Sequence, residues 1–316
     1  MIHKFSVRTD LLFLLFAMLW GASYPVTQSA ISTINPYLFV FLRFSVAALI
    51  MLPFIMKEFK TSIIPWVKIG IVLGLLNTGI YTFETLSLKY TSVSKSAFIM
   101  GSNVILVPFL SHIFRISHIT VLEIISAVFF LFGLYILTGS HFENINHGDV
   151  LALFGAVAIA LSITYVSHIS RNHINPILLT FFQLAFTCPI PILLYMAEPT
   201  SSVVFSSSTI FAICFCGIFA TTLPLLGQIK FQQYTSAAQT ASIFALEPIF
   251  AIIFAYIFYK EAITFEIILG GTIMLLSTML PVLIKFLKEK KHEKLAIQSV
   301  IKKDYLLTRS NADVLS

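Results

Sequence analysis

Residues 87–110 read SLKYTSVSKSAFIMGSNVILVPFL, and residues 230–253 read KFQQYTSAAQTASIFALEPIFAII. The second stretch repeats the first, because Tyr90–Ser92 recurs as Tyr234–Ser236, 144 positions later. A second match pairs Asn35-Pro36 with Asn175-Pro176, 140 positions apart. An apolar chain built from two copies of one unit is typical of membrane transporters, which bind their substrate between the copies.

The composition indicates an integral membrane protein. Of the 316 residues, 58% are hydrophobic and only 11% are charged. A soluble domain carries about 25% charged residues, so this chain has too few charges to cover a surface that faces water. Strands are not expected, because the apolar runs lack alternation and are about twice the length of a barrel strand.

Ten apolar segments of roughly 20 residues each are long enough to cross a bilayer as helices. We therefore predict an all-α fold of ten transmembrane helices, arranged as two five-helix repeats over residues 11–139 and 149–286. Residues 1–10 and the basic tail 287–316 are expected to lie in the cytoplasm. The ten segments fall near residues 11–31, 37–56, 67–88, 94–114, 119–139, 149–169, 177–197, 209–229, 237–258 and 265–286.

The positions of Lys and Arg predict the orientation. With a cytoplasmic N-terminus, the cytoplasmic loops hold eight Lys and Arg residues before the tail, against two on the other side. Both termini are therefore expected to be cytoplasmic, in the inner membrane. Each repeat has an odd number of spans, so the second copy starts on the opposite face. The repeats are expected to be inverted about an axis in the membrane plane.

The remaining composition excludes several classes of protein. The net charge of +6 comes largely from the last 32 residues, which is typical of a cytoplasmic tail and does not indicate nucleic-acid binding. Cys188, Cys214 and Cys216 lie in apolar runs without the spacing of a zinc site or a disulfide framework. No metal or cofactor is expected.

Four segments resemble a known family: LWGASYPVTQSAI (19–31), Arg43 in the second span, YTSVSKSAFI (90–99) and ALEPIFAIIFAYIFYKEAIT (245–264). The chain is similar to bacterial drug/metabolite transporters of the EamA type over roughly residues 10–286. This resemblance implies ten helices and a central cavity lined mainly by spans one, three, four, six, eight and nine. It also implies a secondary transporter for amino acids or other small metabolites, with export as the expected direction.

The third span carries a polar face. Asn77, Tyr81 and Glu84 follow at i, i+4 and i+7, and these offsets place them on one side of a helix. Such a face indicates either a cavity wall or a row of hydrogen bonds between helices. Gly70 and Gly74, four residues apart, are expected to let another helix approach closely.

Charged residues inside the spans predict a cluster. Counted from Lys89 in the loop, Glu84 and Lys95 lie at similar depth on neighbouring helices, and Arg43 enters from the same side. We expect Glu84 to pair with Lys95 or with Arg43. The excess positive charge would attract an anionic group of a substrate, unless the pair only holds helices together.

Glu247 lies near the middle of the ninth span, directly before Pro248. Proline removes one backbone donor and frees the carbonyl of Phe244, so a kink is expected beside the carboxylate. Glu247 could hold a proton, bind a cationic group or bond to a neighbouring helix. Its counterpart in the first repeat is Asn103, and this difference between the copies marks both positions as candidates for substrate recognition.

Further candidates lie on the other spans implied by the resemblance. Trp20 and Tyr24 are four apart in the first span, and aromatic rings with polar tips suit a cavity for an amphipathic metabolite. Tyr165 follows Ser162 by three in the sixth span. The predicted substrate-binding residues are Trp20, Tyr24, Asn77, Tyr81, Glu84, Lys95, Asn103, Tyr165 and Gln228, and the predicted coupling or charge cluster comprises Arg43, Glu84, Lys95 and Glu247.

Motifs for nucleotide hydrolysis, zinc proteolysis and serine hydrolysis are absent from the sequence. We therefore expect a secondary transporter that moves a small metabolite by alternating access, and no enzyme. A channel or a lipid flippase is the alternative, followed by an intramembrane enzyme. The expected partners are a small-molecule substrate and the lipid bilayer, with a homodimer left open and nucleic acid excluded.

Overall fold

The computed structural model describes residues 2–58, 63–137, 145–170, 174–198, 205–280 and 284, and within these ranges the chain is helical with short connections and no strand. It divides into a unit over residues 1–278 and a second over 279–316. The predicted basic tail lies outside the described residues.

The helices are α1 (Ile2–Ile31), α2 (Pro36–Ile55), α3 (Ile64–Tyr90), α4 (Val93–Met100), α5 (Asn103–Ile113), α6 (Val121–Leu137), α7 (His147–Ile169), α8 (Pro176–Thr187), α9 (Pro189–Ala197), α10 (Ser207–Gly217), α11 (Leu223–Phe231), α12 (Ala237–Phe244) and α13 (Glu247–Tyr259), followed by an apolar helix over Phe265–Leu280.

Eight helical segments in the described part of the chain are long and apolar enough to cross a membrane. Two shorter apolar helices, Val121–Leu137 and Phe265–Leu280, accompany them. Each of the ten apolar segments predicted from the sequence is mostly helical where the structure describes it, with short breaks in the fourth, seventh and ninth. The all-helical membrane architecture is therefore confirmed.

The duplicated residues cap equivalent helices. Asn35 and Asn175 each accept backbone N–H groups at the start of a helix that begins with proline, namely α2 and α8. Ser92 and Ser236 likewise cap α4 and α12 through their hydroxyl oxygens. Side-chain acceptors at these positions satisfy amides that have no partner inside the helix, so the repeated sequence fixes where these spans begin.

The fourth and ninth spans are interrupted at equivalent places. Helix α4 ends at Met100 and α5 begins at Asn103, and α12 ends at Phe244 and α13 begins at Glu247. The second break confirms the kink predicted at Pro248, which cannot donate to the carbonyl of Phe244. In the first break, the Asn103 side-chain amide donates to the Met100 carbonyl at 2.9 Å.

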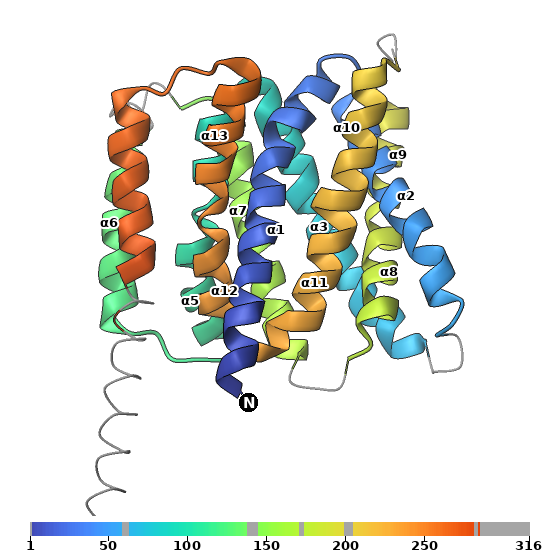
Figure 1. Cartoon of the computed structure of the whole chain (residues 1–316), viewed down its shortest axis with the longest axis horizontal. Coiled ribbons are helices and arrows are strands. Elements are labelled where there is room, and N and C mark those ends of the chain that lie inside the picture. The colour runs from blue at the N-terminus through green and yellow to red at the C-terminus, as the bar shows by residue number, and fades with distance from the viewer. Residues whose placement is uncertain are drawn as a thin grey trace, which may run out of the picture. The chain divides into compact units, whose positions relative to one another are not determined.

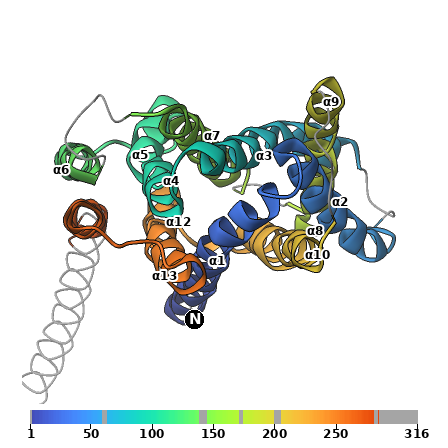
Figure 2. The same ribbon diagram turned by 90° about the horizontal axis from the view of Figure 1, so that it is seen from above.

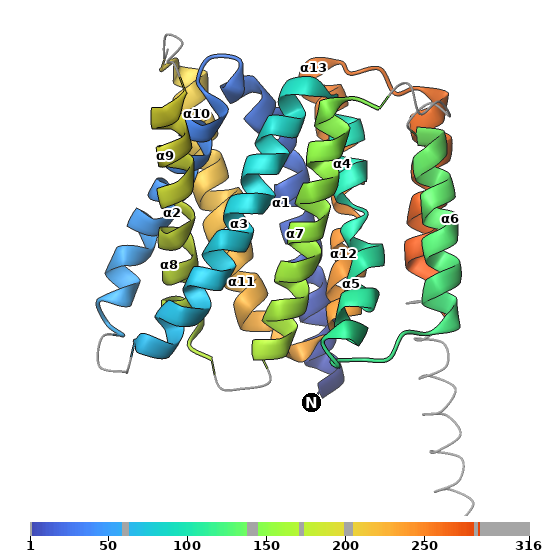
Figure 3. The same cartoon turned by 180° about the vertical axis from the view of Figure 1, so that it is seen from behind.

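Helices α1 and α3 occupy the middle of the bundle. Figure 1 shows α1 between α13 on one side and α10 and α11 on the other. Seen from behind in Figure 3, α3 lies between α7 and the α8–α9 pair. The view from above in Figure 2 shows α4, α5, α12 and α13 to one side of α1 and α3, and α2, α8, α9 and α10 to the other.

Glycines allow the closest helix contacts. A Cβ atom built on Gly74 of α3 would lie 2.6 Å from the Phe186 Cβ and 3.0 Å from the Gln183 carbonyl oxygen of α8. A Cβ atom on Gly217 of α10 would lie 2.9 Å from the Arg43 carbonyl oxygen of α2. The predicted close approach at Gly74 is thus confirmed, and the second repeat has an equivalent contact at Gly217.

We predict that Gly74→Ala and Gly217→Ala each lower the stability of the protein by about 1–3 kcal/mol, because backbone must move to admit the methyl group. Thermal unfolding of the purified protein in detergent measures this. Gly79→Ala, also in α3, is the matched control, since its Cβ would make only ordinary contacts, 3.5 Å from Ala158. Equal losses in all three variants would contradict the packing argument.

Candidate functional site

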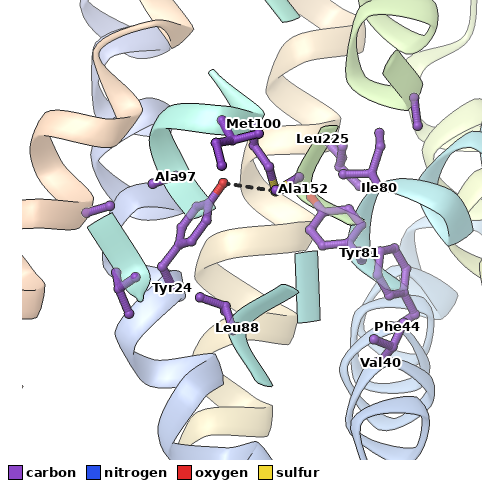
Figure 4. Packing of buried hydrophobic residues seen from close by; sticks show 14 of the residues in the cluster. Tyr24, Val40, Phe44, Ile80, Tyr81, Leu88, Ala97, Met100, Ala152 and Leu225 are labelled. Atoms are coloured by element: carbon purple, nitrogen blue, oxygen red, sulfur yellow. Dashed lines mark hydrogen bonds between the residues drawn. The ribbon is translucent and has the colours of Figure 1, made fainter. Parts of the chain in front are cut away.

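A cavity of about 50 Å³, measured as the space open to the centres of water-sized spheres, lies inside the bundle, between helices of both repeats. All its lining residues come from spans one, three, four, six, eight and nine, which are the six that the resemblance implies. Figure 4 shows four of the residues that line this cavity, Tyr24, Ile80, Tyr81 and Leu225. The Tyr24 hydroxyl is directed at the Met100 sulfur. The lining residues are Trp20, Tyr24, Asn77, Ile80, Tyr81, Glu84, Asn103, Ile159, Ser162, Ile163, Leu225, Gln228, Phe244 and Glu247.

The polar face of α3 forms one wall. Asn77, Tyr81 and Glu84 all line the cavity, as their helical spacing predicts. Of the two interpretations of this face, the structure therefore favours the cavity wall. Two further lining residues pack against each other: Trp20 of α1 lies edge-on to Phe244 of α12, with ring centroids 4.8 Å apart.

Several buried polar atoms on these walls have no hydrogen-bond partner. They include the Trp20 indole nitrogen, the Asn77 amide nitrogen, the Glu84 Oε1 atom and the Asn103 amide oxygen. A buried polar group without a partner costs roughly 1–3 kcal/mol, and native proteins keep few of them. Donors and acceptors that converge on one cavity are the arrangement expected of a binding site.

Arg43 lies beside the cavity and is fully buried. Its Nε donates to the Thr221 hydroxyl at 2.7 Å, and its Nη2 donates to the Ala220 carbonyl at 3.1 Å. Its Nη1 lies 3.8 Å from Glu84 Oε1, and its guanidinium carbon lies 4.3 Å from the centre of the Tyr81 ring. Of the two partners expected for Glu84, the structure therefore selects Arg43.

The hydrogen bond from Arg43 to the Ala220 carbonyl depends on a local feature that sequence reasoning missed. Residues Ile218–Thr222 form a π-helical turn between α10 and α11, and Pro224 follows in the first turn of α11. Pro224 has no N–H group to offer the carbonyl four residues earlier, which belongs to Ala220. Arg43 supplies the missing donor. The feature of the sequence that could have indicated this irregular turn is Pro224, which lies inside an apolar span, seven residues after Gly217.

Lys95 does not join this cluster, which corrects the expected depth match with Glu84. Residues Thr91 and Ser92 form the connection between α3 and α4, so Lys95 lies in the first turn of α4, at the end of the span. Its Nζ lies 2.6 Å from Asp149 Oδ2, at the start of α7. The predicted cluster of four is therefore a group of three, since Arg43, Glu84 and Glu247 are close enough to interact electrostatically.

The remaining candidates divide between the cavity and its surroundings. Asn103, Gln228 and Glu247 line the cavity. Tyr165 does not, and packs against a buried cluster that includes Leu73. Ser162, three residues before Tyr165, lies on the wall instead.

These features together define an integral membrane protein of the transporter class, with a polar cavity among its spans. The chain matches the EamA-like transporter family over residues 7–139 and again over 146–283, and it belongs to that family. The family and the names of its relatives indicate a transporter rather than an enzyme.

Relatives with printed names agree with this assignment. A protein of Archaeoglobus fulgidus named as an uncharacterized transporter is 30% identical over 274 residues, which cover 86% of this chain and 84% of the relative. The uncharacterized transporter YvbV of Bacillus subtilis is 24% identical over 87% of this chain and 92% of its own length. A solved crystal structure with 14% identity covers 88% of this chain and 97% of that chain, with a TM-score of 0.66, and supports the fold.

We predict that Arg43→Gln and Glu84→Gln each destabilise the protein, by about 3–5 kcal/mol, because each leaves the other charge buried without its partner. The double variant should regain part of this loss. Thermal unfolding in detergent of the wild type, both single variants and the double variant completes the cycle.

The pair Lys95→Gln and Asp149→Asn is the matched control, because the Lys95 side chain is 17% exposed and its ion pair is expected to contribute less. Strictly additive losses for Arg43→Gln and Glu84→Gln would show that the two side chains do not stabilise each other.

Proposed function

We propose that the protein is a secondary transporter that moves a small amphipathic metabolite across the inner membrane by alternating access, in the direction of export. The observation that carries this proposal is the cavity, because its walls come from both repeats and present buried polar atoms without partners. The cavity also offers aromatic and aliphatic surface, which suits a ligand with a polar end and an apolar body.

Reciprocal contacts support an inverted arrangement of the two repeats. Asn35 donates to Glu198, and Asn175 donates to Glu58 at 2.8 Å. Asn175 and Glu198 lie 140 positions after Asn35 and Glu58, respectively. An operation that exchanges the repeats therefore turns one contact into the other. With five spans in each repeat, such an axis lies in the membrane plane.

A second pair of contacts follows the same rule. Lys95 of the first repeat pairs with Asp149 of the second, and Gln239 of the second donates to Asp10 of the first at 3.0 Å. One contact joins the first turn of α4 to the first turn of α7, and the other joins the first turn of α12 to Asp10, the ninth residue of α1. We define these two contacts as the end contacts. One is an ion pair and the other is a neutral donor on a carboxylate, so the two ends of the transporter are held with different strength.

Alternating access requires each end to open in turn while the other stays closed. In this proposal the end contacts break in turn. The proposed direction of export rests on the family resemblance. The proposed inner-membrane location, with both termini in the cytoplasm, rests on the distribution of Lys and Arg.

We predict that locking either end stops transport. The test uses Lys95→Cys with Asp149→Cys, or Asp10→Cys with Gln239→Cys, in a background where Cys188, Cys214 and Cys216 are replaced by serine. A short bifunctional thiol reagent should abolish saturable flux of substrate into proteoliposomes in both variants, and a cleavable linker should restore flux after reduction.

Each single-cysteine variant treated with the same reagent is the control. Flux that persists with either end locked would contradict alternating access, and flux that rises linearly with substrate concentration would indicate a channel.

A further inference from the structure

The charges around the cavity do not balance. Glu84 and Glu247 line it, and among the described residues Arg43 is the one basic side chain that contacts this group. Arg43 is already engaged by Glu84, Tyr81, Thr221 and Ala220. With all three side chains ionised the group carries a formal charge of −1, and a net charge inside a membrane protein must be balanced by a counter-ion or by a proton on a carboxyl group.

Glu247 is the carboxylate that lacks this counter-ion. Within the described part of the chain, no Lys, Arg or His nitrogen lies within 4.0 Å of it, because the ion pairs there join Arg43 to Glu84 and Lys95 to Asp149. Lys95 is held at the end of the span by Asp149 and does not reach the cavity lining. The unbalanced negative charge therefore lies on the α13 side of the cavity.

The neighbours of Glu247 suit an organic cation. Tyr24, Trp20 and Phe244 line the same cavity, and aromatic faces attract cations at short range. The Asn103 amide oxygen is a buried acceptor without a partner, and it belongs to the position in the first repeat that matches Glu247. A protonated amine offers three donors for such acceptors.

Aliphatic side chains complete the lining of the cavity. Ile159 and Ile163 of α7 line the cavity together with Leu225 and Ile80. With Asp10 aligned to Asp149, these two isoleucines occupy in the second repeat the places that Trp20 and Tyr24 hold in the first. The cavity thus combines acidic, aromatic and aliphatic side chains, and it fits a molecule with a cationic head and an apolar body.

We propose that the cavity binds small organic cations, with a protonated amine at Glu247 and an apolar body against Ile159 and Ile163. This inference rests on the proposed transport function for its role, but binding itself is tested separately. The Glu84–Arg43 pair stays intact in the bound state and contributes no free charge to the ligand.

The test uses three probes that share a phenyl group and differ in charge: phenethylamine, phenylalanine and phenylacetate. The protein has two tryptophans, so Trp66→Phe leaves Trp20 in the cavity as the single fluorescent reporter. We expect saturable quenching of Trp20 by phenethylamine at millimolar concentration or below, weaker quenching by phenylalanine and none by phenylacetate. Glu247→Gln should weaken phenethylamine binding by about tenfold or more, as expected for the loss of a charge-assisted hydrogen bond.

Glu123→Gln in α6 is the matched control and should leave binding unchanged, because Glu123 is half-buried in the first turn of α6 and is not among the residues that line the cavity. If Glu247→Gln does not yield folded protein, Glu247→Asn places in α13 the residue that its counterpart Asn103 already provides, and the same loss is expected.

Binding of phenylacetate as tight as that of phenethylamine, no saturable quenching by phenethylamine, or unchanged preference in the Glu247 variants would overturn the proposal. Flux of the same probes into proteoliposomes separates the two claims. Phenethylamine binding without saturable flux would contradict transport and leave the cation site standing, whereas saturable flux of phenylacetate alone would contradict the cation site and leave transport standing.

Discussion

The buried guanidinium of Arg43 is the constraint around which the cavity is built. Moving such an ion out of water costs several kcal/mol unless its donors find partners. The partners come from two elements: Glu84 and Tyr81 on α3, and the Thr221 hydroxyl and Ala220 carbonyl in the π-helical turn. Arg43 therefore fixes α2, α3 and the α10–α11 span together, and it holds two cavity residues in place. A π-helical turn beside a site is a common functional feature, and here its free carbonyl is the one that Pro224 leaves without a donor.

The two repeats share what builds the fold and differ in what lines the cavity. The shared residues cap helices, as Asn35, Asn175, Ser92 and Ser236 do. The residues that differ have chemical consequences, since Glu247 stands where the first repeat has Asn103. Matched positions that hold different residues in the two copies make the site asymmetric. A ligand with two unlike ends requires such a site.

The helical spans and the polar face of α3 could be predicted from the sequence, because each depends on spacing along one helix. The partner of Lys95 could not, because counting residues from Lys89 treats Thr91 and Ser92 as helical, and they are a connection. The prediction that Tyr165 lines the cavity was wrong, because a residue three places from a lining residue can still face a neighbouring helix. The contact between Arg43 and Ala220 joins residues 177 positions apart and needs the fold itself.

The central claim is that the cavity is a transport site reached from each side of the membrane in turn. Ser162→Cys in a cysteine-free background tests it most directly, because Ser162 lines the cavity and the replacement is small. A membrane-impermeant maleimide, applied to right-side-out and to inside-out vesicles, should label this cysteine from both sides, and substrate should slow both reactions. Labelling from one side alone, or from neither, would contradict the account.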